Sequence, residues 1–270
     1  MKICLDAGHY GKYNQSPANK AYWESDFSWK FHLLLKAELE KYGIQVITTR
    51  TEQKKDLALE ERGRRSKGCD LFLSIHSNAC GTESADHPLA CVCVSGKCDV
   101  LGLDLAQAVA KCMETNSGRI WKRKGNGNAD YYGVLRGAAQ VGTPGILLEH
   151  SFHTNRRSTA WLLDDNNLRR MAQVEANVIA AHFGVSAPDT STPDPAPQPA
   201  PDGSFMVRVV CAELNVRAGA GTEYPVRMRV AKGEVYTIVA TTKSKDGGTW
   251  GKLKSGAGWI NIGSKYVAKI

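Results

Sequence analysis

Four residues have side chains that could bind a metal ion and activate water: His9, Glu24, His76 and Glu149. Three of them, His9, His76 and Glu149, follow or end short apolar segments that are typical of buried strands. In an α/β sheet, such residues meet at the carboxyl edge of the strands, where binding sites form. Two imidazoles and one carboxylate match the ligand set of a catalytic zinc, which leaves one position open for water. The remaining glutamate would then be the general base of a hydrolysis.

Each of these residues alone also has an ordinary structural explanation. A histidine after a strand is more often a surface or capping residue than a ligand. Glu24 could be an acid in the first turn of a helix, where the helix dipole favours it. Glu149 is harder to explain in this way, because it follows the apolar residues 145–148 and a buried carboxylate needs a partner or a metal. The combination of the four residues therefore predicts a metal hydrolase.

The sequence around these residues resembles the zinc-dependent N-acetylmuramoyl-L-alanine amidases of the amidase 3 family. The resemblance runs from Met1 to about Phe183. It rests on DAGHYG at residues 6–11 and on Glu24 with the helical segment that follows it. It continues through the blocks ERGRRSKGCDLFLSIHSNA and PGILLEHSFHTN.

The resemblance implies one zinc ion per chain, with His9, Glu24 and His76 as ligands and Glu149 as the catalytic glutamate. It also implies the reaction, which is hydrolysis of the amide between N-acetylmuramic acid and L-alanine in peptidoglycan. Zinc would supply a Lewis acid, and Glu149 would move the proton from water to the leaving amine. A zinc peptidase or deacetylase acting on the cell wall, and a wall-binding protein with an inactive catalytic domain, are the alternatives.

Three further residues are candidates for substrate binding. Arg136 could clamp a substrate carboxylate, although a solvated surface arginine explains it equally well. His153 lies just beyond the strand that carries Glu149, where a loop could bring it to the substrate. Asn78 belongs to the same sequence block as the second histidine of the predicted site.

The sequence departs from the family pattern at two places. His150 stands where a small or apolar residue is usual, and Arg65 and Ser66 stand where Ala-Asn is frequent. Because side chains alternate along a strand, we expect His150 on the face opposite to Glu149, in a structural role.

Helical and strand patterns alternate through residues 1–186. Helices are predicted at about residues 25–42, 57–67, 102–115 and 167–182. Short apolar segments predict strands at about residues 2–6, 45–49, 71–75, 89–94 and 145–148. The alternation predicts an α/β catalytic domain, with a twisted, mostly parallel sheet flanked by helices.

The remainder of the chain predicts a linker and a second domain. Residues 187–203 contain six of the ten prolines and predict a Pro-rich linker. Residues 204–270 hold short strand-like segments between Gly-rich turns. Their LNVRAG, YP and GWI stretches resemble the bacterial SH3-like domains of wall-lytic enzymes, which implies a small all-β SH3-like barrel. Tyr224 and Trp250 are candidates for a cell-wall-binding groove, whereas Trp259 is expected in the core.

The charge is concentrated in this second domain. The chain has a net charge of +8, and residues 204–270 alone, with 11 Lys and Arg against four Asp and Glu, carry +7. A basic domain favours an anionic polymer as partner. We expect peptidoglycan and anionic wall polymers such as teichoic acid, rather than nucleic acid.

The predicted compartment follows from what the sequence lacks. It has no apolar run of about 18 residues, so no membrane insertion is expected. Met1 leads into the first strand without the features of a signal peptide, so a cytoplasmic protein with eight reduced cysteines is expected. Cys91, Cys93 and Cys98 form a weak metal pattern, and structural thiols are favoured. Such an enzyme must be released to reach the wall. A phage endolysin freed by a holin fits best, and a bacterial autolysin or sporulation amidase is the alternative.

Overall fold

The computed structural model describes residues 1–186, 204–254 and 257–270. The chain divides into two compact units, Met1–Asp189 and Thr190–Ile270. The Pro-rich linker predicted at residues 187–203 lies outside the described residues.

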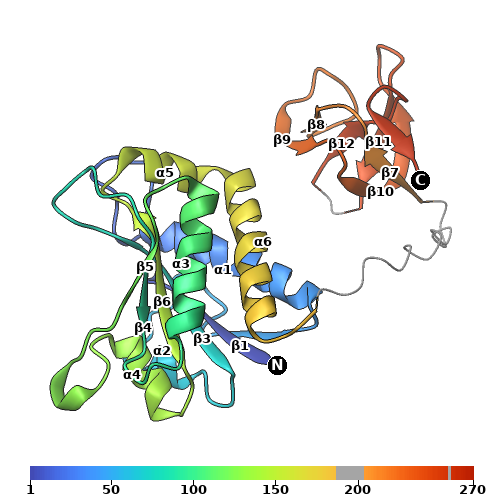
Figure 1. Ribbon diagram of the computed structural model, residues 1–270. Helices are drawn as coiled ribbons and strands as arrows, with labels where there is room; N and C mark the ends of the chain where they lie inside the picture. The colour runs from blue at the N-terminus through green and yellow to red at the C-terminus, as the bar shows by residue number, and fades with distance from the viewer. Residues whose placement is uncertain (187–203, 255–256) are drawn as a thin grey trace. The chain divides into compact units, whose positions relative to one another are not determined.

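The first unit is built on a six-stranded sheet (Figure 1). Its strands are β1 (Lys2–Ala7), β2 (Gln45–Thr48), β3 (Leu71–Asn78), β4 (Leu89–Val92), β5 (Arg119–Trp121) and β6 (Gly145–Phe152). They lie in the order β2-β1-β3-β6-β4-β5. Strands β2, β1, β3 and β6 are parallel, β4 is antiparallel to β6, and β5 is parallel to β4. The prediction of a mostly parallel α/β sheet is confirmed.

Helices cover both faces of this sheet. They are α1 (Glu24–Lys41), α2 (Leu59–Arg64), α3 (Asp99–Met113), α4 (Gly133–Gln140), α5 (Arg156–Leu163) and α6 (Asp165–His182). Helices α1, α3 and α6 pack on one face, and α2 and α4 lie on the other (Figure 1). Nowhere in the described part of the chain is a helix both long enough and apolar enough to span a bilayer.

The alternation of side chains along the strands supplies both cores. In β1, Ile3 and Leu5 are fully buried in the core beneath α1, α3 and α6. Cys4 between them belongs to the smaller core beneath α4, which also contains Phe72 and Leu147. A sheet that is buried on both faces needs apolar residues at successive positions, which explains the continuous apolar runs in the sequence.

Helices α4 and α5 and strand β5 were not predicted, and α4 shows why. Its sequence, GVLRGAAQ, contains two glycines, which are poor helix formers. These glycines are needed for packing, because a Cβ on Gly137 would lie 2.1 Å from the Glu60 carbonyl oxygen of α2. In the same way, a Cβ on Gly63 would lie 2.0 Å from the Val134 carbonyl oxygen. The tertiary contact between α2 and α4 therefore outweighs local propensity.

The three cysteines flagged in the sequence are buried, as expected for structural thiols. Strand β4 ends at Val92, between Cys91 and Cys93, and the side chains of these two cysteines lie in different cores. Cys93 Sγ forms a hydrogen bond with Ser95 Oγ at 3.2 Å. Among the described residues, these thiols are not part of a group with metal-binding geometry.

The second unit is an antiparallel sheet of seven strands, in the order β13-β7-β10-β11-β12-β8-β9. The strands are β7 (Phe205–Val209), β8 (Glu213–Arg217), β9 (Val226–Ala231), β10 (Val235–Lys243), β11 (Thr249–Leu253), β12 (Trp259–Asn261) and β13 (Val267–Lys269). Its apolar core includes Val216, Ile238 and Ile260, all fully buried. The predicted all-β second domain is therefore present.

The aromatic residues of this unit are placed differently from the prediction. Trp250 is only 3% exposed, and its indole Nε1 donates a hydrogen bond to Ser244 Oγ at 3.0 Å. It therefore fills the interior and is not a surface contact for a wall polymer. Trp259, expected in the core, is half-buried, and the neighbouring Ile260 is the core residue. Tyr224 is 44% exposed and is free to contact a ligand.

Candidate metal centre

Neighbouring strands of the first unit bring the four predicted residues together. His9 follows β1, His76 lies near the end of β3, and Glu149 lies in β6. In the parallel register of β3 and β6, His76 is the partner of Glu149, so their side chains leave the same face of the sheet. Glu24 is the first residue of α1 and approaches from the helical layer.

Three of these side chains form a compact group of potential metal ligands. Glu24 Oε2 lies 3.1 Å from His9 Nε2, and Glu24 Oε1 lies 2.9 Å from His76 Nδ1. All three ligand atoms lie within 4.8 Å of one another. Within residues 1–186, 204–254 and 257–270 no other group of His, Cys, Asp or Glu has this geometry. The group could hold one metal ion.

The carboxylate of Glu24 is buried but fully hydrogen-bonded. Besides the two histidines, Asn14 Nδ2 donates to Oε2 at 2.7 Å and the Ser77 amide donates to Oε1 at 3.0 Å. Burial alone would raise the pKa of Glu24, but the hydrogen bonds from His76 and His9 outweigh it and hold that pKa well below its usual range. Glu24 is therefore an anion, as a metal ligand must be.

The carboxylate of Glu149, unlike that of Glu24, has an oxygen without a hydrogen-bond partner in the described part of the chain. Its Oε2 is buried and has no hydrogen-bond partner among the described residues. Burial, and then the negative charge of Glu24, raise the pKa of Glu149 well above its usual value. A cation held by the neighbouring ligands would lower this pKa again. A carboxylate with one free oxygen beside a metal centre is suited to accept a proton from water.

The metal centre opens into a pocket of about 350 Å³. Asn78 and His153, two of the predicted substrate-binding residues, line this pocket together with His9, Glu24, His76 and Glu149. His153 directly follows β6, and its Nδ1 lies 2.8 Å from the Ser77 carbonyl oxygen. The structure therefore places both residues where they can contact a bound substrate.

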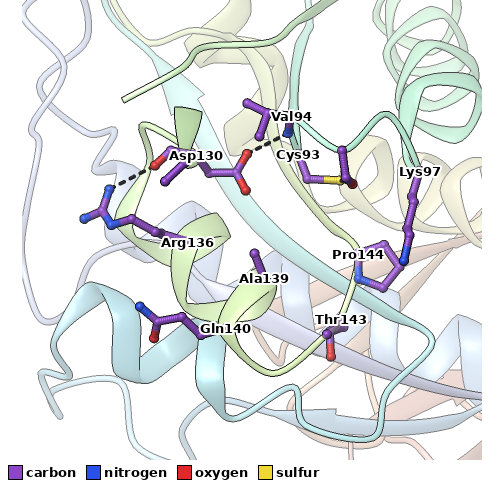
Figure 2. Close-up of a pocket in the computed structure, with 12 residues that line it drawn as sticks. Cys93, Val94, Lys97, Asp130, Arg136, Ala139, Gln140, Thr143 and Pro144 are labelled. Atoms are coloured by element: carbon purple, nitrogen blue, oxygen red, sulfur yellow. Dashed lines mark hydrogen bonds between the residues drawn. The ribbon is translucent and has the colours of Figure 1, made fainter. Parts of the chain in front are cut away.

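Arg136, the third candidate for substrate binding, does not line this pocket. Its Nε pairs with Glu60 Oε1 at 2.8 Å, and its Nη1 donates to the carbonyl oxygens of Asp130 and Tyr131. It lines a different pocket, of about 470 Å³, together with Asp130, Thr143 and other residues (Figure 2). Arg136 ties α4 to α2, and this geometry does not support the predicted carboxylate clamp.

Two residues of the site were missed in the sequence. Asn14 contacts both Glu24 and His9, and Tyr132 lines the pocket. Asn14 and His9 both have positive φ angles, 54° and 57°, which are uncommon for residues other than glycine and often occur at functional sites. Because Asn14 lies in the loop between His9 and Glu24, its position in the sequence could have identified it as a residue of the site. The position of Tyr132 depends on the unpredicted helix α4.

His150 lies on the face opposite to Glu149, as the alternation along the strand predicted. Its Nδ1 faces the His76 carbonyl oxygen at 3.0 Å, and its Nε2 faces Glu175 Oε1 of α6 at 2.8 Å. Burial by itself would lower the pKa of His150, but the charge and hydrogen bond of Glu175 raise it. The pair is buried against the rings of Phe27 and Phe31. It connects the backbone of a metal ligand to the helical layer.

The fold and the site together define a metal-dependent hydrolase. A model of the family described as N-acetylmuramoyl-L-alanine amidase, Amidase_3, matches residues 3–181. The chain belongs to this family, and it is an amidase that acts on peptidoglycan. One curated relative is the N-acetylmuramoyl-L-alanine amidase CwlM of Bacillus licheniformis. It is 27% identical over 192 residues, which are 69% of this chain and 70% of the relative.

Solved structures of similar fold cover about the same part of the chain. The catalytic domain of the amidase CwlV from Bacillus (Paenibacillus) polymyxa var. colistinus has a TM-score of 0.59 at 22% identity, covering 68% of this chain and 99% of that chain. The amidase AmiC2 of Nostoc punctiforme has a TM-score of 0.59 at 21% identity, with 68% and 97% covered. Cwp6 from Clostridium difficile has a TM-score of 0.58 at 26% identity, with 67% and 29% covered.

The buried pair of His150 and Glu175 generates a prediction about stability. Replacing His150→Leu leaves the Glu175 carboxylate buried without its partner, so we expect a loss of about 3–5 kcal/mol in the free energy of unfolding. The double variant with Glu175→Leu removes both charges and should recover most of this loss. Unfolding in urea, monitored by the circular dichroism of the helices, measures the free energy of unfolding of the single and the double variant. A single variant as stable as the parent would show that the pair is not coupled.

Proposed function

We propose that the chain cleaves the amide between N-acetylmuramic acid and L-alanine with one zinc ion held by His9, Glu24 and His76. The observation that carries the proposal is the grouping of these three ligands beside the unpaired oxygen of Glu149. Two imidazoles and a carboxylate are a donor set that suits a catalytic zinc. The zinc dependence of the family supports the choice of metal.

The environments of the two glutamates assign their roles. When bound, zinc supplies a Lewis acid for attack on the amide. Both oxygens of Glu24 already accept hydrogen bonds, so Glu24 is a poor proton acceptor. Glu149 has a free oxygen in the same pocket, and it accepts the proton of the attacking water. Glu149 then returns that proton to the departing amine of L-alanine, so that no separate acid is required.

Substitutions at the two kinds of residue separate ligand from base. Glu149→Gln should keep the zinc and lower hydrolysis by about 10²–10⁴-fold. His76→Ala should lose the zinc, because only two of the three ligands remain. Elemental analysis gives the zinc content, and newly exposed N-terminal L-alanine from purified wall gives the activity. Loss of zinc from Glu149→Gln, with zinc kept by His76→Ala, would reverse the assignment.

The same assay separates the amidase from its alternatives. A peptidase would release amino termini of other residues, and a deacetylase would release acetate without any new amino terminus. An inactive wall-binding protein would release neither. Only the amidase produces N-terminal L-alanine that depends on Glu149.

We propose that the second unit binds the cell wall as an SH3-like domain. Its support is the antiparallel β architecture together with the net charge of +7 on residues 204–270. Such a charge attracts anionic wall polymers. Of the two aromatic residues considered for a groove, only Tyr224 is exposed enough to contribute.

Removal of the second unit should lower the rate of hydrolysis of insoluble substrate and leave the rate on soluble substrate unchanged. A chain ending at Val185 keeps the catalytic pocket and should cleave soluble muropeptides as fast as the full chain. It should be slower on intact wall, because tethering raises the effective concentration at the substrate. Binding of the full chain to wall should weaken at about 0.5 M salt, where the Debye length is only a few ångströms. Equal clearing of whole cells by both chains would contradict the targeting role.

We further propose that the enzyme acts as a phage endolysin, made in the cytoplasm and released to the wall through a holin. The combination of a catalytic unit with a separate basic unit supports a wall-lytic role of this kind. A bacterial autolysin or sporulation amidase is the alternative. Cells that express the chain should lyse only when a holin is expressed with it. Lysis without any holin would favour an autolysin with its own export route.

A further inference from the structure

An arginine held by aromatic rings lies next to the catalytic pocket. The guanidinium carbon of Arg123 lies 3.5 Å from the centre of the Tyr131 ring and 5.3 Å from that of Trp121. Tyr131 is followed directly in the chain by Tyr132. Tyr132 lines the pocket that contains Glu149, so Arg123 stacks on the residue that precedes a pocket-lining side chain.

The backbone around this group is ordered. The Tyr131 amide donates to the Arg123 carbonyl oxygen at 3.0 Å, and Lys124 forms a β-bridge with Asp130. The Gly125 amide donates to the Ala129 carbonyl oxygen at 2.8 Å, which closes the tip of the loop. Arg123 and its two rings are therefore placed side by side before any ligand binds, which lowers the entropic cost of binding.

Arg123 carries a charge that no acidic side chain of the described residues neutralises by a salt bridge. Two nearby cations do have acidic partners, because Lys122 pairs with Asp99 and Arg136 pairs with Glu60. Trp121 and Tyr131, each 45% exposed, flank the guanidinium at the surface. Ring stacking engages the faces of a guanidinium and leaves N–H groups at its edge available to a planar acceptor.

The side chains that line the catalytic pocket offer no basic group to a substrate carboxylate. The lining of the pocket contains Glu24 and Glu149 but neither lysine nor arginine. A substrate carboxylate that pairs with a basic side chain must therefore do so outside this lining. Arg123 lies close to this lining through Tyr131, the neighbour of Tyr132, and a guanidinium binds a carboxylate through two parallel hydrogen bonds.

We propose that Arg123, flanked by Trp121 and Tyr131, binds a carboxylate of the peptide stem next to the amide that is cleaved. The proposal rests on the amidase function proposed above and adds a substrate class to it. The enzyme selects stems with a free carboxylate near the cleaved bond, and Arg123, rather than Arg136, is the residue that recognises it.

Two soluble muropeptides test this recognition. They are identical except that the second residue of the stem carries either a free carboxylate or the corresponding carboxamide. The parent enzyme should have the lower KM for the carboxylate compound. Arg123→Gln should raise that KM by about tenfold or more, since hydrogen bonds to charged groups are the strong ones. It should leave kcat, and the KM for the carboxamide, unchanged. Arg123→Lys should restore part of the KM, because it keeps the charge and loses the planar fork.

Arg170→Gln is the matched control. The guanidinium of Arg170 also lies over a tryptophan, 5.8 Å from the centre of the Trp161 ring. Trp161 lies in α5 and Arg170 in α6, and Arg170 does not line the catalytic pocket. Neither KM should change in this variant. Thermal unfolding checks that all variants are folded. If Arg123→Gln changes both substrates equally, or neither, the proposed recognition is wrong.

Failure of the subsite can be told apart from failure of the reaction. If the parent cleaves neither muropeptide, the proposed amidase function fails. Calorimetric binding of the two uncleaved compounds to the Glu149→Gln protein, with and without Arg123→Gln, still reports the carboxylate contact. Tighter binding of the carboxylate compound that is lost with Arg123→Gln supports the subsite, and equal binding of both compounds overturns it.

Discussion

The arrangement of the catalytic unit depends on the hydrogen bonds and ion pairs that the buried carboxylate of Glu24 forms. Glu24 opens α1, and its two oxygens accept hydrogen bonds or pair with groups from the loop after β1 and from β3. An unpaired charge at this depth would cost several kcal/mol, so the contacts from His9, His76 and Asn14 must form together. The same contacts place the three potential ligands around one point. Packing of the helical layer on the sheet and the arrangement of the potential metal ligands thus depend on the same contacts.

The two faces of strand β6 carry residues with different roles. On one face, Glu149 keeps a free oxygen in the pocket beside His76. On the other face, the next residue, His150, contacts the His76 backbone and pairs with Glu175 of α6. The alternation of side chains along a strand allows adjacent residues to serve these two purposes. A histidine at position 150 therefore fits the fold although it departs from the family pattern.

The sequence allowed the sheet, the main helices and the four central residues to be predicted, because these depend on local patterns. Apolar segments before His76 and Glu149 indicated neighbouring parallel strands, whose binding sites form at one edge of the sheet, although β3 and β6 continue beyond these two residues. The partner of Arg136 could not be predicted, since it follows from the close approach of α2 and α4 at Gly137. The burial of Trp250 likewise depends on tertiary packing in the second unit. Polar residues on loops, such as Arg123, acquire a role only from neighbours that the chain brings together.

The most direct test of this account is a crystal structure of the zinc-loaded protein, with anomalous scattering recorded at the zinc absorption edge. The account predicts a single peak in the catalytic unit, in contact with His9, Glu24 and His76, with Glu149 in the same pocket but not bonded to the metal. A peak at any other site, or one bonded to Glu149 in place of Glu24, would contradict it.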